Sequence, residues 1–310
     1  MPLSERLRGE ITVGAFRTGA ALGRFAPRPL GMGVTSAAAR LARATATGRR
    51  EIVERNLRRI YGPGLSGPDL SRKVQATFDS YARYYYDAFR LPSMETSRIA
   101  GGIVVDGVEH LEEAMAHDAV GPVLALPHLG GWEWAAAWIT KVRGWGLAAV
   151  VEELDPPELF DWFLQFRESL GVNIIPLGAD AAARVAAAAL DKEIVCLLSD
   201  RDIGGNGVEV EFFGERTTLP AGPAVMALRT GCRILPTAVY FNEEDGVRGL
   251  VRPPLEVSRQ GRLRDDVSRV TQQLAVELEI LIRKAPEQWH LMQPNWPSDR
   301  VASGFGVPAS

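Results

Sequence analysis

The sequence predicts an α/β protein in which a single domain has a mostly parallel central sheet flanked by helices. Short runs of apolar and β-branched residues alternate with helical segments from residue 120 onward, a pattern typical of crossover connections between parallel strands. The 310 residues, 46% of them hydrophobic, suffice to build one large core. The first 60 residues are strongly basic, which predicts a helical N-terminal arm at a membrane interface.

The expected elements follow one another with little linker sequence. Strands are expected at residues 120–126, 147–151, 172–176, 194–198, 233–240 and 250–257. Helices are expected at residues 70–90, 132–141, 156–170, 179–190, 220–230 and 264–284. A Gly- and Pro-rich stretch at residues 61–69 separates the arm from the body. We therefore divide the chain into an arm (1–60), an α/β domain (61–300) and a tail (301–310).

The arm carries positive charge and apolar residues together. Residues 1–60 contain twelve arginines and four glutamates, a net charge of +8, which leaves −11 for the remaining 250 residues. Apolar side chains are interleaved with those arginines, at Ile11, Phe16, Leu22, Phe25 and Leu30. This combination favours an anionic lipid surface as the partner. The alternative is a helical arm that packs on the domain, with its arginines simply solvated. Nucleic acid is not expected, because the arm offers few aromatic side chains for base stacking.

Several classes of protein and of site are excluded. The longest uncharged stretch, residues 119–132, holds two prolines and is too short to span a membrane. Cys196 and Cys232 lie in apolar runs and are expected to be buried free thiols. The sequence has no nucleophile elbow, zinc-binding helix, P-loop or dinucleotide-binding glycine motif. No metal site is expected, since His128, Asp200 and Asp202 lack a recognised ligand spacing.

The candidate chemistry follows the expected strands, because ligands bind beyond the carboxyl ends of parallel strands. His128 comes directly after the first of these strands, and two glycines follow it. Glu133 lies in the first turn of the next helix, where a glycine turn can bring its carboxylate back toward the imidazole. Asp200 follows the strand at 194–198. A histidine beside a carboxylate predicts a general base acting without a protein nucleophile.

Four stretches resemble the lipid A lauroyl/myristoyl acyltransferase branch of the glycerolipid acyltransferase superfamily. The first is the His-x4-acid motif in PHLGGWE (127–133), and the others are a helix with one arginine before glycine (157–171), LLSDRD (197–202) and GVEVEFFG (207–214). The closing WHLMQPNW (289–296) is most similar to the phosphatidylinositol mannoside acyltransferases of actinobacteria. The resemblance covers roughly residues 10–300.

The resemblance implies transfer of a long acyl chain from acyl-CoA to a mannose hydroxyl of a phosphatidylinositol mannoside. The enzyme would act as a peripheral protein on the cytoplasmic face of the plasma membrane. It would need no cofactor, since acyl-CoA is a co-substrate. His128 would take the proton of the sugar hydroxyl, and either Asp200 or Glu133 would hold the imidazole. The backbone N–H groups of Gly130 and Gly131 are candidates for stabilising the oxyanion.

Three further residues are candidates for substrate binding. Glu152 resembles a family position near the acceptor sugar. Arg167 and Arg201 carry guanidinium groups suited to phosphate or carboxylate; the alternative is that Arg167 forms a structural ion pair with Glu133, Glu152 or Asp200, and that Arg201 pairs with Asp202. The Trp289–Trp296 stretch either closes the pocket or packs in the core. The alternative functions are the same chemistry on another glycolipid acceptor and a non-catalytic protein that binds anionic lipid.

Overall fold

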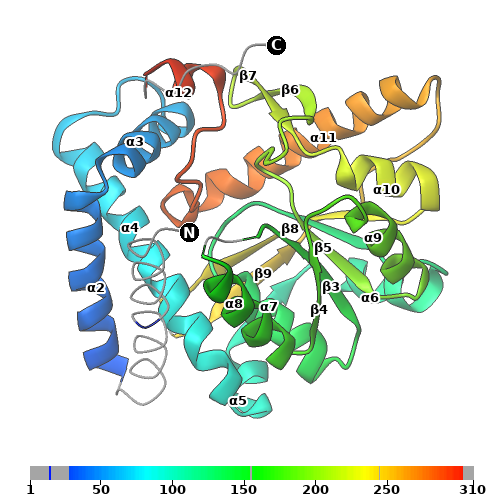
Figure 1. Ribbon diagram of the computed structural model, residues 1–310, viewed down its shortest axis with the longest axis horizontal. Helices are drawn as coiled ribbons and strands as arrows, with labels where there is room; N and C mark the ends of the chain where they lie inside the picture. Colours follow the sequence, from blue (N-terminus) through cyan, green and yellow to red (C-terminus); the bar gives the residue numbers. More distant parts are fainter. Residues whose placement is uncertain (1–13, 15–27, 154–155, 244, 303–310) are drawn as a thin grey trace.

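The computed structural model describes residue 14 and residues 28–153, 156–243 and 245–302 (Figure 1). Over these residues the chain is an α/β protein with a mostly parallel sheet, as the sequence predicts, and this sheet has seven strands. Among the helices of the described part, none is both long and apolar enough to cross a membrane.

The main sheet has the strand order β1-β9-β8-β2-β5-β3-β4. Its strands are β1 (Ile103–Asp106), β2 (Val123–Leu126), β3 (Leu147–Val151), β4 (Val172–Pro176), β5 (Ile194–Leu198), β8 (Ile234–Phe241) and β9 (Val247–Val251). Every neighbouring pair is parallel except β8 and β9, which form an antiparallel hairpin. The carboxyl ends of β2, β5 and β3 therefore meet at one edge of the sheet.

The prediction of a strand at residues 250–257 is wrong in its position. The strand observed there is β9, which ends at Val251. Pro253 and Pro254 follow within the predicted range, and proline has no N–H with which to continue a strand ladder. Strand β1 was not predicted from the sequence.

No strand is predicted between residues 198 and 233, whereas the structure has a β-hairpin there, of β6 (Val208–Phe212) and β7 (Glu215–Leu219). Its turn residues Phe213 and Gly214 both have positive φ, as a tight hairpin turn requires. The alternation of Val208, Val210 and Phe212 with glutamates was the available signal.

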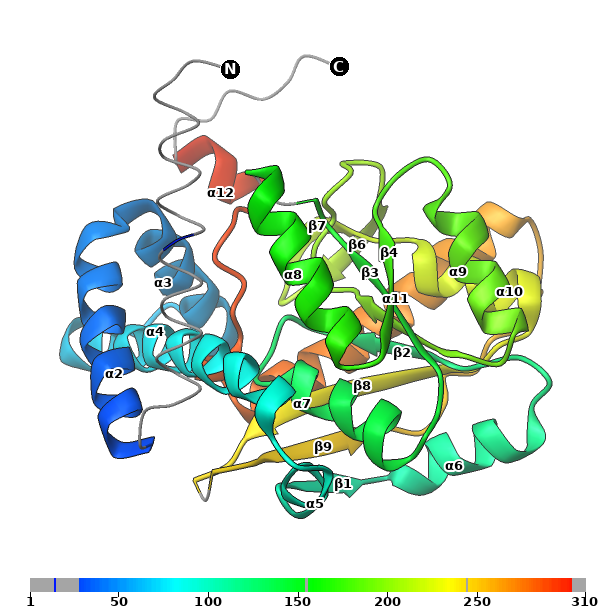
Figure 2. The same ribbon diagram turned by 60° about the horizontal axis from the view of Figure 1, so that its bottom comes forward.

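Helices cover both faces of the sheet and one of its ends (Figures 1 and 2). They are α2 (Arg28–Thr45), α3 (Thr47–Tyr61), α4 (Gly67–Arg90), α5 (Thr96–Gly101), α6 (Val108–His117), α7 (Trp132–Ala137), α8 (Pro157–Ser169), α9 (Ala181–Leu190), α10 (Gly222–Thr230), α11 (Leu263–Lys284) and α12 (Pro297–Ala302). Helix α7 continues into a π-helical turn, η2 (Trp138–Val142), and short 3₁₀ turns occupy Leu91–Ser93 (η1) and Pro286–Gln288 (η3).

Successive side chains of the central strands enter two different cores. In β2, Val123 and Ala125 pack with α9, α10 and α11, whereas Leu124 and Leu126 pack with α6, α7 and α8. This follows from the two-residue period of a strand, and both faces must be apolar because both are covered. Cys196 and Cys232 are buried free thiols, as expected.

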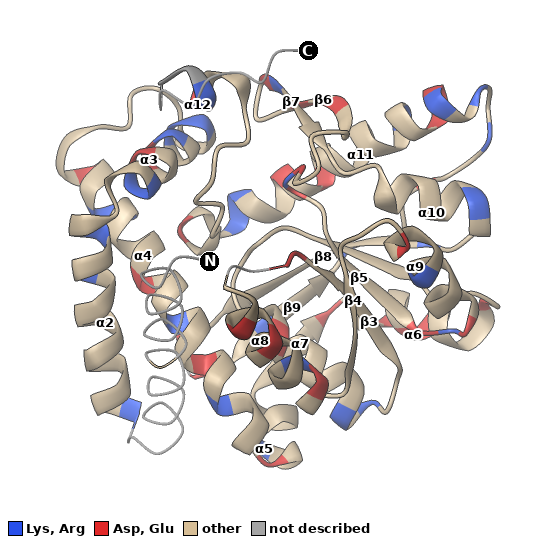
Figure 3. Ribbon diagram, in the orientation of Figure 1, with Lys and Arg blue, Asp and Glu red and all other residues tan. Residues whose placement is uncertain are grey.

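Helices α2, α3 and α4 form a third layer beside the sheet, with a small core that includes Val53, Leu57 and Phe78. Arginines are prominent on α2 and α3 (Figure 3). Several of them pair with the body, as Arg59 does with Glu215 and Asp299. The arm's apolar residues Ile11, Phe16, Leu22 and Phe25, and the tail from residue 303, lie outside the described residues.

Candidate active site

His128 and Asp200 are brought together by the register of two neighbouring strands. Strand β2 pairs with β5 in parallel, and Leu126 lies opposite Leu198. His128 and Asp200 each stand two residues beyond that pair, so both leave the sheet at the same place. The sequence supplies each residue at a strand end, and the adjacency of β2 and β5 makes them neighbours.

The two side chains form a close pair. His128 Nδ1 lies 2.6 Å from Asp200 Oδ1, and the backbone N–H of His128 donates to Asp200 Oδ2 at 3.0 Å. Trp289 Nε1 donates to the same Oδ2 at 2.7 Å. Asp200 is fully buried, whereas 30% of the His128 side chain remains exposed. The carboxylate therefore fixes the ring from the inside while the ring faces the surface.

The charge state of Asp200 follows from these contacts. Burial raises its pKa, but His128 and the N–H donors outweigh burial, and the pKa lies below its ordinary value. An ionised carboxylate only accepts hydrogen bonds, so the proton on this side of the imidazole belongs to Nδ1. In the neutral imidazole the opposite nitrogen, Nε2, carries no proton and can accept one, which is the state that a general base requires.

Two glycines shape the turn after His128. Gly130 has φ +59°, and a Cβ there would lie 1.8 Å from the carbonyl oxygen of Val239. A Cβ at Gly131 would lie 2.7 Å from the ring of Phe241. The turn is pressed against β8, and this close approach is why it needs residues without a side chain.

The same turn does not offer the oxyanion donors expected from the sequence. The Gly130 N–H donates to the carbonyl of Gln288 at 3.0 Å, and the Gly131 N–H donates to that of Val239 at 3.3 Å. Both N–H groups are engaged because the turn packs against two other backbone segments. The expectation of an oxyanion hole at Gly130-Gly131 is therefore wrong.

Glu133 has different partners from His128. Its Oε1 accepts hydrogen bonds from Tyr84 of α4 and from Arg167 of α8, the latter at 3.3 Å. Only 2% of the Glu133 side chain is exposed, and burial raises its pKa despite the nearby arginine. Of the two carboxylates considered from the sequence, Asp200 bonds to the imidazole. Glu133 instead ties α7 to α4 and α8.

The structure gives Arg167 the ion-pair partner that the sequence allowed as an alternative, Glu133. Its guanidinium carbon also lies 5.0 Å from the ring centre of Trp132. Arg201 pairs with Glu152 at 3.1 Å rather than with Asp202. Strands β3 and β5 are adjacent, so Glu152 and Arg201 come from neighbouring strand ends, and both side chains are partly exposed.

The sequence did not identify the residues that hold the His128–Asp200 pair. Trp289 donates to the Asp200 carboxylate, Asn295 Nδ2 donates to the Asp200 carbonyl at 3.1 Å, and the His290 N–H donates to the His128 carbonyl at 2.7 Å. The available signal was the concentration of aromatic and amide residues at 289–296. These residues pack in the core and also contact the site directly.

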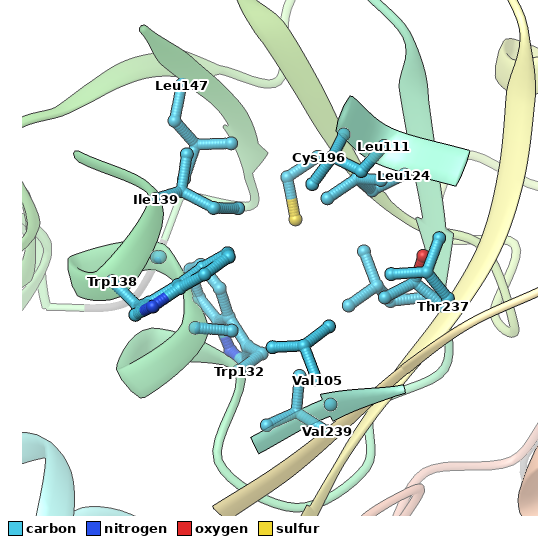
Figure 4. Close-up of a pocket in the computed structure, with 15 residues that line it drawn as sticks. Val105, Leu111, Leu124, Trp132, Trp138, Ile139, Leu147, Cys196, Thr237 and Val239 are labelled. Atoms are coloured by element: carbon cyan, nitrogen blue, oxygen red, sulfur yellow. The ribbon is translucent and has the colours of Figure 1, made fainter. Parts of the chain in front are cut away.

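An apolar cavity of ≈ 30 Å³ lies between the sheet and α7, on the α6–α8 face of the sheet (Figure 4). Trp132 and Trp138 form one side of it, and Cys196 directs its sulfur into it. Leu126, also in its wall, is two residues before His128. Within the described ranges, no group of three or more His, Cys, Asp or Glu side chains could hold a metal ion.

Comparison with known proteins identifies the family of this chain. A family described as bacterial lipid A biosynthesis acyltransferase matches residues 12–298. The phosphatidylinositol mannoside acyltransferase of Mycolicibacterium smegmatis is 39% identical over 305 residues, which cover 96% of each chain. Proteins of the same name from two Mycobacterium tuberculosis strains are 38% identical over 258 residues, covering 81% of this chain and 78% of theirs. The chain belongs to the bacterial lipid A biosynthesis acyltransferase family.

Proposed function

We propose that this acyltransferase moves a long-chain acyl group from acyl-CoA to a mannose hydroxyl of a phosphatidylinositol mannoside. The names of the mycobacterial relatives support phosphatidylinositol mannoside as the acceptor. The observation that carries the reaction is the pairing of a partly exposed His128 with a fully buried Asp200. Such a pair activates a hydroxyl without forming a covalent enzyme intermediate.

In the proposed reaction, His128 Nε2 takes the proton of the sugar hydroxyl as its oxygen attacks the thioester carbonyl. An ester C–O bond forms, the C–S bond breaks, and the CoA thiolate leaves with the proton returned from the imidazolium. Asp200 stays ionised throughout and stabilises the positive charge on the ring. Cys196 is unsuited to act as a nucleophile, because burial raises the pKa of its thiol to about 12.

Substrate groups would meet the carboxyl edge of the sheet. Glu152 and Arg201 are partly exposed there, so their ion pair can open to bind sugar hydroxyls and a phosphate. Arg167 is also proposed to contact substrate, although it already neutralises Glu133. The apolar cavity of ≈ 30 Å³ has room for about one water-sized group, and its side chains must move before it can accept an acyl chain.

The enzyme is proposed to act as a peripheral protein on the cytoplasmic face of the plasma membrane. Three large apolar side chains of α2 are strongly exposed, Leu30 at 63%, Val34 at 63% and Leu41 at 66%. Their spacing of four and seven residues sets them on one side of the helix. An apolar helix face flanked by arginine suits insertion among anionic headgroups.

The deciding experiment is acyl transfer from palmitoyl-CoA to purified phosphatidylinositol mannoside, with the wild type and His128→Ala compared. The wild type is expected to form the ester, and the variant to lose about 10²–10⁴ in rate. Thioester hydrolysis without acyl transfer would support His128 as the general base but would show that the mannoside is not the acceptor. Transfer to a different glycolipid alone would select another acceptor, and equal rates in both proteins would refute the mechanism.

A further inference from the structure

Residues 289–296, here called the C-terminal segment, run between the helical layer and the carboxyl edge of the sheet. On the helical side, Asn56 of α3 donates to the carbonyl of Leu291 at 2.9 Å, and Ser80 of α4 lies 2.9 Å from His290 Nε2. On the sheet side, Trp289 forms an isolated antiparallel bridge with Leu129. The segment is therefore held from both sides where it passes the His128–Asp200 pair.

Three hydrogen bonds connect the C-terminal segment to that pair. Two involve main-chain carbonyls, from the His290 N–H to His128 and from the Asn295 amide to Asp200. The third is the bond from Trp289 Nε1 to Asp200 Oδ2, at 2.7 Å. Of the three bonds, this one goes to a side chain of the pair, so removing it changes the surroundings of the carboxylate itself.

We infer that Trp289 is a positioning residue, whose indole N–H fixes the Asp200 carboxylate in the orientation that holds His128 ready to accept a proton. With Oδ1 on the imidazole, the position of Oδ2 determines the tilt of the carboxylate plane. Oδ2 has two donors, the His128 backbone N–H and the indole. Trp289 is 3% exposed, so water cannot readily replace its N–H.

The surroundings of the indole ring make this N–H a fixed donor. The Trp289 ring packs against Phe213, Phe212 and Trp296, with centroid separations of 5.7, 6.2 and 6.3 Å. A ring held on these sides keeps its N–H aimed at Oδ2. Because a hydrogen bond to a charged carboxylate is stronger than one between neutral groups, the loss of this contact should disturb Asp200 more than the loss of a neutral hydrogen bond would.

The test is Trp289→Phe, which removes the N–H and keeps an aromatic ring. Its matched control is Trp134→Phe, because Trp134 of α7 is also buried but its Nε1 donates to the carbonyl of Ile99 at 3.1 Å rather than to Asp200. The inference rests on the proposed function, so kcat and KM are measured for palmitoyl-CoA and phosphatidylinositol mannoside. The downfield NMR resonance of the His128 Nδ1 proton, assigned with Asp200→Asn, is recorded as well.

Trp289→Phe is expected to lower kcat by about 10- to 100-fold, the factor for one charge-assisted hydrogen bond. Both KM values should stay near those of the wild type, and the Nδ1 proton resonance should shift. Trp134→Phe should leave kcat and the resonance unchanged even if its melting temperature falls. If Trp289→Phe does not fold, benzothienylalanine at position 289 keeps the bicyclic shape without the N–H and is measured in its place.

Equal losses of kcat in the two variants would assign Trp289 a structural role only and overturn the inference. An unchanged resonance and kcat in Trp289→Phe would overturn it too. If the wild type transfers no acyl group to the mannoside, the proposed function fails. The NMR comparison still decides whether the indole orients the pair.

Discussion

His128 Nδ1 lies 2.6 Å from Asp200 Oδ1, although the two residues are 72 positions apart in the chain. The carboxylate that the family motif brings close in sequence, Glu133, is bonded instead to Tyr84 and Arg167. The two acids therefore have separable tasks, and removing each gives a different result.

Asp200→Asn is expected to lower kcat by about 10²–10⁴, since an amide can donate to Nδ1 and stabilise the wrong imidazole tautomer. Glu133→Gln should have a much smaller effect on kcat, because its side chain bonds to Tyr84 and Arg167. Steady-state rates of both variants, with circular dichroism as a folding check, provide the measurement. A larger loss from Glu133→Gln would reverse the assignment.

Arg167→Met is expected to destabilise the protein by about 3–5 kcal/mol, because it leaves the buried carboxylate of Glu133 without its cation. The double variant Glu133→Gln/Arg167→Met should recover most of that loss, since no buried charge is left unpaired. The unfolding free energies of the wild type, the two single variants and the double variant, measured in urea, form a double-mutant cycle. A KM for the mannoside that stays raised in the stable double variant would support substrate binding by Arg167.

Gly130→Ala is expected to destabilise the protein far more than Gly144→Ala. Both glycines have positive φ, +59° and +67°, but only the added Cβ at Gly130 meets another atom, the carbonyl oxygen of Val239 at 1.8 Å. Gly144→Ala should cost only the left-handed backbone penalty, about 1–2 kcal/mol. Chemical denaturation compares the two variants, and equal losses would mean that the turn can move away from β8.

His290 is expected to make stability sensitive to acid. Burial, together with the nearby His128, lowers the pKa of His290 from 6.5 to about 3. Between these values the unfolded chain binds a proton that the folded chain does not, so stability falls as the pH falls through this window. In His290→Gln, the unfolding free energy should lose this dependence on pH, a slope of up to about 1.4 kcal/mol per pH unit in the wild type. Unfolding free energies measured from pH 7 downward test this, and parallel curves would contradict it.

Replacing Leu30, Val34 and Leu41 together by asparagine is expected to weaken flotation with anionic liposomes. The matched control is Leu190→Asn, because Leu190 of α9 is 61% exposed but lies far along the chain from α2. The control should float like the wild type. Undiminished binding by the triple variant would show that α2 does not provide the lipid contact.

Local sequence pattern determined much of this protein. The strands at 147–151, 172–176 and 194–198 are observed at their predicted limits, and the helix predicted at 156–170 is observed as α8, Pro157–Ser169. Strand and helix periods are set by contacts within a few residues, so a sequence carries them directly. The same local pattern, with the family motif, identified His128 and Asp200 as candidates.

Only the tertiary structure decided which of these residues meet. Strand order set β2 beside β5 and so paired His128 with Asp200. The packing of the turn against β8 and against Gln288 occupied the two glycine N–H groups. The fold also brought Trp289 to the Asp200 carboxylate across 89 positions. These contacts join segments far apart in the chain, and local periodicity carries no information about which distant segments pack together.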